Sequence, residues 1–151
     1  MAKVNVTYYD VLKEFEAAAD AHYAIASFDS GTLDYLDASA TNRRYPYVYM
    51  RPISATLADR TRTLTFELYS LDQPKTASSS NVSVISDTEM TIYDILAWFN
   101  YGPADRQQWY ELNVVTIAPV NEAFQDRVYG WVATIEVVTP FNLDYCNYPQ
   151  P

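Results

Sequence analysis

Apolar positions recur with a helical period in the stretch Ser86–Asn100. The apolar stripe of this stretch comprises Ile85, Ile92, Ile95, Leu96, Trp98 and Phe99. Ser86 and Glu89 form an S-x-x-E pattern, which is typical of the capping box at the start of a helix. Gly102-Pro103 follows, and this pair is typical of a helix end. The pattern predicts a central helix whose apolar face lies on a sheet.

A second stretch with the helical period runs from the N-terminal region to the single histidine. Its apolar stripe comprises Tyr8, Val11, Leu12, Phe15, Ala18, Ala19 and His22. Thr7 is suited to cap this helix, and Asp10 stands three residues further on. We therefore predict a helix over about Thr7–His22.

After the first predicted helix, the apolar residues no longer recur with the helical period. Ala24–Phe28 predicts a short extended segment that ends at Asp29-Ser30-Gly31. Leu33–Leu36 is compatible with another short strand that pairs locally, and the polar segment Asp37–Arg44 predicts a loop. This part of the chain therefore contributes little strand beyond one short piece.

Two longer runs alternate with the period of two that strands require. The runs are Tyr45–Leu57 and Arg62–Leu71, and Ala58–Thr61 between them predicts a tight turn. In the second run, Leu64, Phe66 and Leu68 face one way, while Thr63, Thr65, Glu67 and Tyr69 face the other. Pro46 and Pro52 place the first run at a sheet edge or mark its ends. These runs predict a hairpin.

Two further strand-like runs follow the central helix. They span residues 109–119 and 127–140, and Trp131, Ala133, Ile135 and Val137 share one face of the second run. The loop predicted between them is Val120–Asp126, with Phe124 as an exposed candidate at its tip. Polar connections are predicted at Asp72–Ser80 and Pro103–Gln108.

The predicted order is helix, short strand, hairpin, helix, hairpin and C-terminal arm. This order indicates an α+β fold, with a mostly antiparallel sheet and two main helices packed on one face. We expect a single domain over residues 1–140. Residues 141–151 have no regular period and are expected to form an extended arm.

Composition limits the classes of function. The net charge is −9, so binding of duplex DNA through phosphate neutralisation is not expected for the chain as a whole. Acidic charge favours solubility, and it also suits a channel through which DNA slides without sticking. The single cysteine, Cys146, excludes an intramolecular disulfide, and a reducing compartment is expected. No secretory signal and no apolar run long enough to span a membrane is found.

The residues offer little for catalysis or metal binding. His22 is the only histidine, and its place on the apolar stripe favours a packed or capping role over a general base. Cys146 lies in a tail rich in Pro and Asn, without a histidine nearby in sequence. One histidine and one cysteine cannot build a structural zinc site. We expect no cofactor, no metal and no small-molecule substrate, although a dispersed carboxylate pair remains an alternative.

Basic and aromatic residues are the candidates for interaction surfaces. The basic candidates lie on or near the first hairpin and comprise Arg43, Arg44, Arg51, Arg60 and Arg62. They suit contacts with an acidic neighbouring subunit, and nucleic-acid contact is the alternative. The chain contains 14 tyrosines, a residue type favoured at protein interfaces. The arm adds the candidates Phe141, Tyr145 and Tyr148, which are expected to dock on a neighbouring chain.

The layout resembles that of small neck and tail-completion proteins of tailed bacteriophages, including the tail-terminator type. The resemblance rests on His22, Ile25, Phe28 and Gly31, on the YPYVYM strand at 45–50, on TFELYSLD at 65–72, and on the Ser-Asp-Thr helix. It covers roughly residues 7–140. Its motifs are structural, so no catalytic residue carries over.

The resemblance implies a virion protein without enzymatic activity that forms a homo-oligomeric ring, a hexamer or a dodecamer. Such a ring joins adjacent neck or tail proteins, and DNA passes through its channel without specific binding. The implied location is the virion neck or tail, after assembly in the host cytoplasm. Two alternatives stay open: a monomeric α+β protein-binding module, and an enzyme that uses a carboxylate pair.

Overall fold

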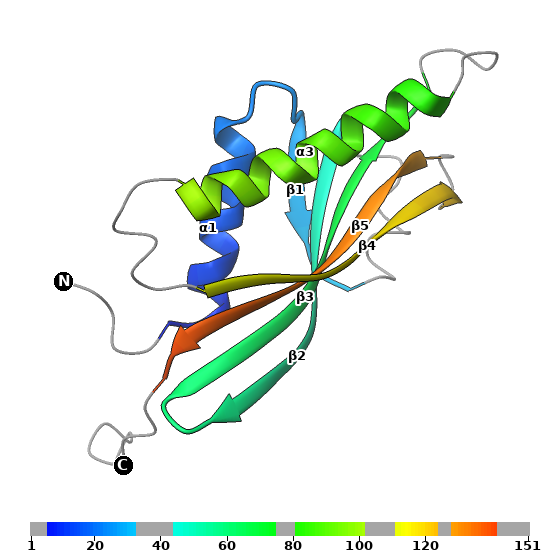
Figure 1. Cartoon of the computed structure of the whole chain (residues 1–151). Helices are drawn as coiled ribbons and strands as arrows, with labels where there is room; N and C mark the ends of the chain where they lie inside the picture. The colour runs from blue at the N-terminus through cyan, green and yellow to red at the C-terminus, as the bar shows by residue number, and fades with distance from the viewer. Residues whose placement is uncertain (1–5, 33–43, 75–80, 102–110, 124–127, 142–151) are drawn as a thin grey trace.

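The structure is a computed structural model that describes residues 6–32, 44–74, 81–101, 111–123 and 128–141. The elements are α1 Tyr8–Ala21, β1 Ser27–Ser30, β2 Tyr47–Ala58, β3 Thr61–Asp72, α3 Asn81–Tyr101, β4 Glu111–Ala123 and β5 Val128–Pro140. The strands form one sheet in the order β1-β2-β3-β5-β4. Both helices lie on the same side of this sheet (Figure 1). The predicted α+β fold is therefore confirmed.

The start of α1 is capped as its sequence predicts. The Thr7 hydroxyl accepts a hydrogen bond from the Asp10 amide at 3.3 Å, and the Asp10 carboxylate accepts from the Thr7 amide at 2.9 Å. The two side chains thus satisfy two amides that a helix start leaves without partners. Val11, Phe15, Ala18 and Ala19 form the buried face of the helix.

The start of α3 differs from the predicted one. The helix begins at Asn81, so Ser86 lies inside it and the predicted capping box is wrong. Glu89 accepts a hydrogen bond from the Tyr93 hydroxyl at 2.7 Å instead. The extra turn is held because Val84 is buried and because the Trp131 indole donates to the Ile85 carbonyl at 2.8 Å. The predicted stop at Gly102-Pro103 lies outside the described residues.

Two alanine variants compare the real cap with the apparent one. We expect Thr7→Ala to lower the free energy of unfolding by about 1 kcal/mol, because it removes the capping hydroxyl. Ser86→Ala is the matched control, and its exposed position within α3 predicts a change within about 0.5 kcal/mol. Urea unfolding of both variants measures these values. A larger loss for Ser86→Ala than for Thr7→Ala would contradict the assignment.

The short strand β1 lies slightly later than predicted and pairs in a parallel sense. It runs over Ser27–Ser30 beside Tyr47–Met50 of β2, so Asp29 and Ser30 extend the strand instead of ending it. The Pro46 carbonyl accepts from the amides of Ala26 and Ser27, which aligns the two strands. The expected strand Leu33–Leu36 and the expected loop up to Arg43 lie outside the described residues.

The first hairpin forms as predicted. β2 and β3 are antiparallel, and Asp59-Arg60 makes the turn, with Arg60 at φ 62°. Pro46 precedes β2, while Pro52 lies within it at a register shift. Because β1 pairs only as far as Met50, the second half of β2 is an edge of the sheet, where a proline removes no ladder hydrogen bond.

The second hairpin is longer than predicted. β4 runs to Ala123 and pairs with β5 as far as Val128, so Val120–Ala123 belongs to a strand and not to the expected loop. Phe124 lies outside the described residues. The shared face of β5 is confirmed, since Ala133, Ile135 and Val137 belong to the main core and Trp131 packs against it.

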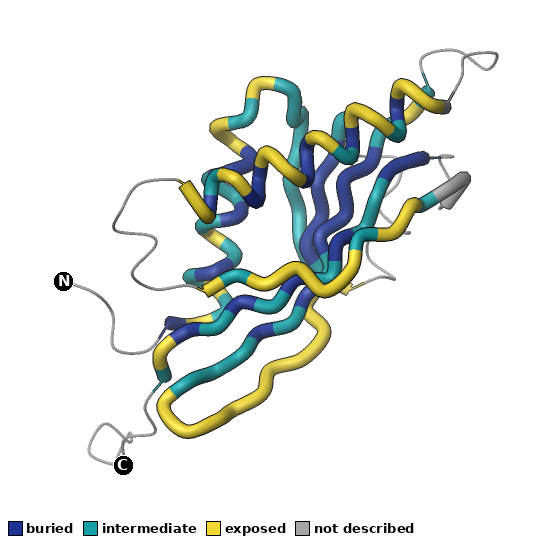
Figure 2. The backbone as a smooth tube through the Cα atoms, in the orientation of Figure 1, coloured by how far each residue is buried: buried dark blue, intermediate teal, exposed yellow. Residues whose placement is uncertain are grey.

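The main core lies between the helices and the sheet. Its largest fully buried side chains on this side include Phe15, Met50, Phe66, Leu68, Ile92, Ile95 and Ile135. Figure 2 shows this burial in the centre of the sheet, while the outer half of β2, the turn that follows it and most of β4 are exposed. The helices therefore leave two sheet margins and part of the opposite face for other contacts.

Candidate interaction surfaces

The sheet face opposite the helices, here called the open face, divides into two halves. One half is a buried tyrosine-rich cluster of Tyr47, Tyr49, Tyr69, Leu71 and Val128. The Tyr49 hydroxyl donates to the Thr32 carbonyl at 2.7 Å, which joins the segment after β1 to this cluster. The tyrosines are thus structural on this half of the face, and their number alone does not indicate an interface.

The other half of the open face is polar. The strand register places there the hydroxyl residues Ser54, Thr56, Thr61, Thr63, Thr65, Thr116 and Thr134. Its positively charged residue is Arg51, and its negatively charged residues are Glu67, Glu111 and Glu136. The polar half therefore carries one cation and three carboxylates among the residues that the structure describes.

One arginine of this half is already engaged. Arg51 Nη1 lies 3.3 Å from Glu67 Oε1, and the Tyr69 hydroxyl donates to Glu67 Oε2 at 2.5 Å. Burial raises the pKa of Tyr69 to about 12, and the hydrogen bond to Glu67 acts in the same direction. The candidate Arg51 therefore neutralises a carboxylate of its own chain across β2 and β3.

The raised pKa predicts a loss of stability at high pH. Below pH 10 Tyr69 is protonated in both states, and its contribution is fully present. Between pH 10 and about 12 the unfolded chain loses this proton first, so the free energy of unfolding falls as pH rises. We expect Tyr69→Phe to reduce this slope in urea unfolding from pH 9 to 12. The fully exposed Tyr23→Phe is the control, and an equal slope for wild type and Tyr69→Phe would contradict the prediction.

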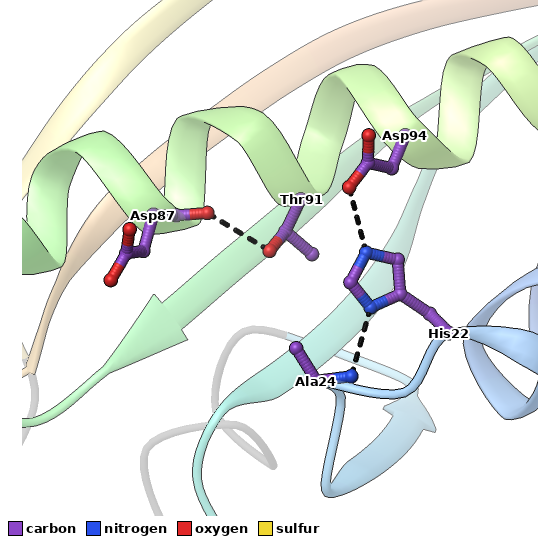
Figure 3. A network of polar contacts seen from close by, with 5 residues as sticks. All are labelled: His22, Ala24, Asp87, Thr91 and Asp94. Carbon is purple, nitrogen blue, oxygen red and sulfur yellow. Dashed lines mark hydrogen bonds and ion pairs between the residues drawn. The ribbon is translucent and has the colours of Figure 1, made fainter.

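The single histidine connects the two helices (Figure 3). Its Nε2 lies 2.8 Å from Asp94 Oδ2 on α3, and its Nδ1 accepts from the Ala24 amide at 3.1 Å. Because Nδ1 is an acceptor, the proton is on Nε2 and is donated to Asp94. The His22 amide also donates to the Ala19 carbonyl at the end of α1. This geometry occupies both ring nitrogens and supports the packed, capping role that the sequence favours.

Arg62 and Phe141 contact each other instead of presenting two separate surfaces. The Arg62 guanidinium lies 5.0 Å from the centre of the Phe141 ring and donates to the Val6 carbonyl. Burial lowers the pKa of Arg62, and nearby Asp10 opposes that shift. The Phe141 amide donates to the Arg60 carbonyl at 3.0 Å. The first arm residue therefore docks on the hairpin of its own chain.

The remaining candidates are not gathered into one site. Arg44 is exposed before β2, where its carbonyl accepts from the Ser27 hydroxyl at 2.6 Å, and Arg60 is exposed at the hairpin turn. Arg43, Tyr145 and Tyr148 lie outside the described residues. The basic candidates thus form no continuous patch within the described part of the chain.

An exposed apolar stripe on α3 was missed by the sequence analysis. We call it the α3 seam, and it comprises Val82, Ser86, Met90, Tyr93, Ala97 and Tyr101. The exposed fractions of Val82, Met90 and Tyr101 are 68%, 55% and 85%. The spacing of three and four residues was available in the sequence. It lies opposite the stripe that faces the sheet, so a prediction of the core residues does not include it.

A second exposed apolar surface lies on the outer half of β2. Ile53 and Leu57 are 44% and 54% exposed there, beyond the part of the sheet that the helices cover. On the opposite margin, β4 exposes Val114 and Val115. Isolated exposed apolar residues are ordinary on protein surfaces, but the sets on α3, on β2 and on β4 indicate contact surfaces.

The described residues offer several exposed surfaces. Within these residues no group of three or more His, Cys, Asp or Glu side chains is placed to hold a metal ion. None of the described helices is both long and apolar enough to cross a membrane. The fold and surfaces together define a small α+β protein with a helix layer on one sheet face and a polar open face. Neither a protein-family model nor a curated protein matched the chain.

Proposed function

We propose that the chain is a structural subunit that assembles into a ring around a DNA channel, in the neck or tail of a tailed bacteriophage. The observation that carries the proposal is the polar half of the open face. Hydroxyl side chains and an excess of carboxylates there form a surface that holds no phosphate tightly. Exposed apolar residues lie on the outer half of β2, on α3 and on β4, where neighbouring subunits can cover them.

The electrostatics of this face fit a channel wall. Charges on a wall act over roughly 8 Å at physiological ionic strength, so carboxylates repeated around a ring repel DNA toward the axis. Arg51 contributes no free attraction, because Glu67 already pairs with it. The threonine hydroxyl groups between the carboxylates carry no charge and can hydrogen-bond to water. DNA can then slide through without specific contacts.

The phage location rests on the resemblance of the layout to neck and tail-completion proteins. Under this proposal the protein is a tail terminator or a head–tail joining subunit, in a ring of six or twelve copies. It is assembled in the host cytoplasm and contacts adjacent neck or tail proteins. A second candidate is a monomeric protein-binding module, which is favoured by the exposed α3 seam if that seam binds a foreign helix.

The test combines assembly with DNA retention. Rings are sought by light scattering and negative-stain electron microscopy, and DNA binding is measured at several salt concentrations. We expect wild-type rings to release DNA, and the double variant Glu111→Lys with Glu136→Lys to retain it. Retention should weaken as salt rises, because it comes from phosphate neutralisation.

The control carries the same kind of charge change on the helix layer. Asp20→Lys lies on the exposed side of α1, away from the open face, and should leave DNA retention in the ring unchanged. Equal DNA retention by the open-face variant and the Asp20→Lys variant would contradict the channel assignment. A chain that stays monomeric at every concentration, alone and with neck proteins, would favour the binding module.

A further inference from the structure

We propose that the α3 seam is the docking site for the outer half of the β2–β3 hairpin of a second copy of this chain. This inference rests on the proposed ring and names the contact that would build it. The seam and the outer half of β2 are exposed apolar surfaces, and the strand register places Leu57 on the helix side of the sheet. The seam is a long stripe flanked by carboxylates, and the outer half of the hairpin carries a short apolar strip that can lie on it.

The seam is a continuous stripe on the side of α3 away from the sheet. At 100° per residue, its six members fall within one arc of about 100°. The buried residues of α3, which include Thr88, Ile92, Ile95 and Phe99, fall on the opposite side. From Val82 to Tyr101 the seam extends over about 28 Å. The core of the same chain therefore makes no use of it.

Carboxylates flank the seam on both sides. Asp87 and Asp94 lie along one side of the stripe, and Glu89 lies along the other. No lysine or arginine occurs in α3. Two α3 seams packed against each other would bring carboxylates close together, which disfavours a symmetric contact. An apolar partner without excess negative charge is favoured instead.

The outer half of the hairpin has the complementary character. Leu57 lies on the helix-side face of the sheet, beyond the part that the helices cover, and is 54% exposed. Ile53 is exposed nearby. The turn carries the exposed residues Asp59 and Arg60, so the end of this apolar strip has no excess of negative charge. The strip Ile53–Leu57 spans about 13 Å, so it fits within the seam.

The positions of the two surfaces favour a contact that repeats. Figure 1 shows the hairpin turn projecting from the body of the molecule, on the other side from the start of α3. One chain therefore presents the hairpin turn at one end and the seam along the helix layer. Such a contact is heterologous, and it generates a closed ring when the rotation between copies closes.

Two broken variants test the contact by complementation. Leu57→Glu disables the hairpin, and Met90→Glu disables the seam, at positions exposed enough to tolerate the change. Each variant alone should be monomeric by light scattering. An equimolar mixture should form a dimer and stop there, because one copy offers an intact hairpin and the other an intact seam. Self-association of either variant at the wild-type level, or a mixture that stays monomeric, would overturn the proposal.

A cysteine pair gives an independent readout. In a Cys146→Ser background, Leu57→Cys with Met90→Cys should give a ladder of disulfide-linked oligomers after oxidation with diamide. Tyr9→Cys with Met90→Cys is the control, because Tyr9 is exposed on α1 outside the contact. Equal yields from the two pairs would overturn the contact. Rings that persist in both glutamate variants would uphold the assembly proposal and reject this interface, so the two failures are distinguishable.

Discussion

Gly130→Ala is expected to lower the free energy of unfolding by about 4 kcal/mol or more, or to prevent folding. A Cβ at Gly130 would lie 1.8 Å from the carbonyl oxygen of Ser70 and 3.1 Å from the Cα of Leu71. These are backbone atoms of the central strand β3, so no side-chain rotation relieves the overlap. The strands would have to separate where β3 and β5 pair. Urea unfolding followed by circular dichroism measures the effect.

Thr134→Ala is the control for this prediction. Thr134 lies on the same strand and the same sheet face, but it is only partly buried. Truncation of this side chain should lower the free energy of unfolding by no more than about 1 kcal/mol. If Gly130→Ala unfolds at the same urea concentration as Thr134→Ala, the close approach of β3 and β5 at this position is wrong.

The second large effect is expected for Phe15→Ala, which should lower the free energy of unfolding by about 3–5 kcal/mol. Phe15 is fully buried, and its ring centre lies 4.9 Å from that of Phe66 on β3 and 4.1 Å from that of Phe99 on α3. Removal of the ring leaves a cavity where α1, α3 and the sheet meet, and it ends both aromatic contacts. Calorimetric and urea unfolding provide the comparison with wild type.

Tyr9→Ala on the same helix is the matched control for the loss of an aromatic ring. Tyr9 is 62% exposed and lies near Lys13, so its truncation should change stability by less than about 0.5 kcal/mol. Comparable losses for the two variants would show that α1 does not contribute its Phe15 face to the core. The orientation of α1 against the sheet would then need revision.

The helices and hairpins could be predicted because their signals are local. Thr7 and Asp10 cap α1 within one turn, and Asp59-Arg60 closes the first hairpin between two alternating runs. Alternation along β5 placed its apolar residues on the correct face. In each case the sequence pattern and the tertiary contacts favour the same structure.

The incorrect predictions concern features that depend on contacts between residues far apart in the sequence. The S-x-x-E pattern at Ser86 is local, but the extra turn of α3 depends on Trp131, which is 46 residues away from Ile85. Parallel pairing of β1 depends on the Pro46 carbonyl, which no periodicity reveals. Short motifs therefore set the kind of element correctly but not its ends.

The candidate surfaces were only partly predictable for the same reason. The sequence nominated Arg51, Arg62 and Phe141, but it could not show that Glu67 pairs with Arg51 or that Phe141 lies against Arg62. The two halves of the open face also emerge only from the strand register. The α3 seam was readable in the sequence, yet its exposure follows from the packing of the opposite stripe on the sheet.

The central claim is that copies of this chain close into a ring. Its most direct test is the solution mass of the full chain, measured by light scattering after size exclusion over a wide range of protein concentration. We expect one closed oligomer of six or twelve copies, whose mass stays constant once it has formed. A monomer throughout that range, or a mass that grows without limit as concentration rises, would contradict it.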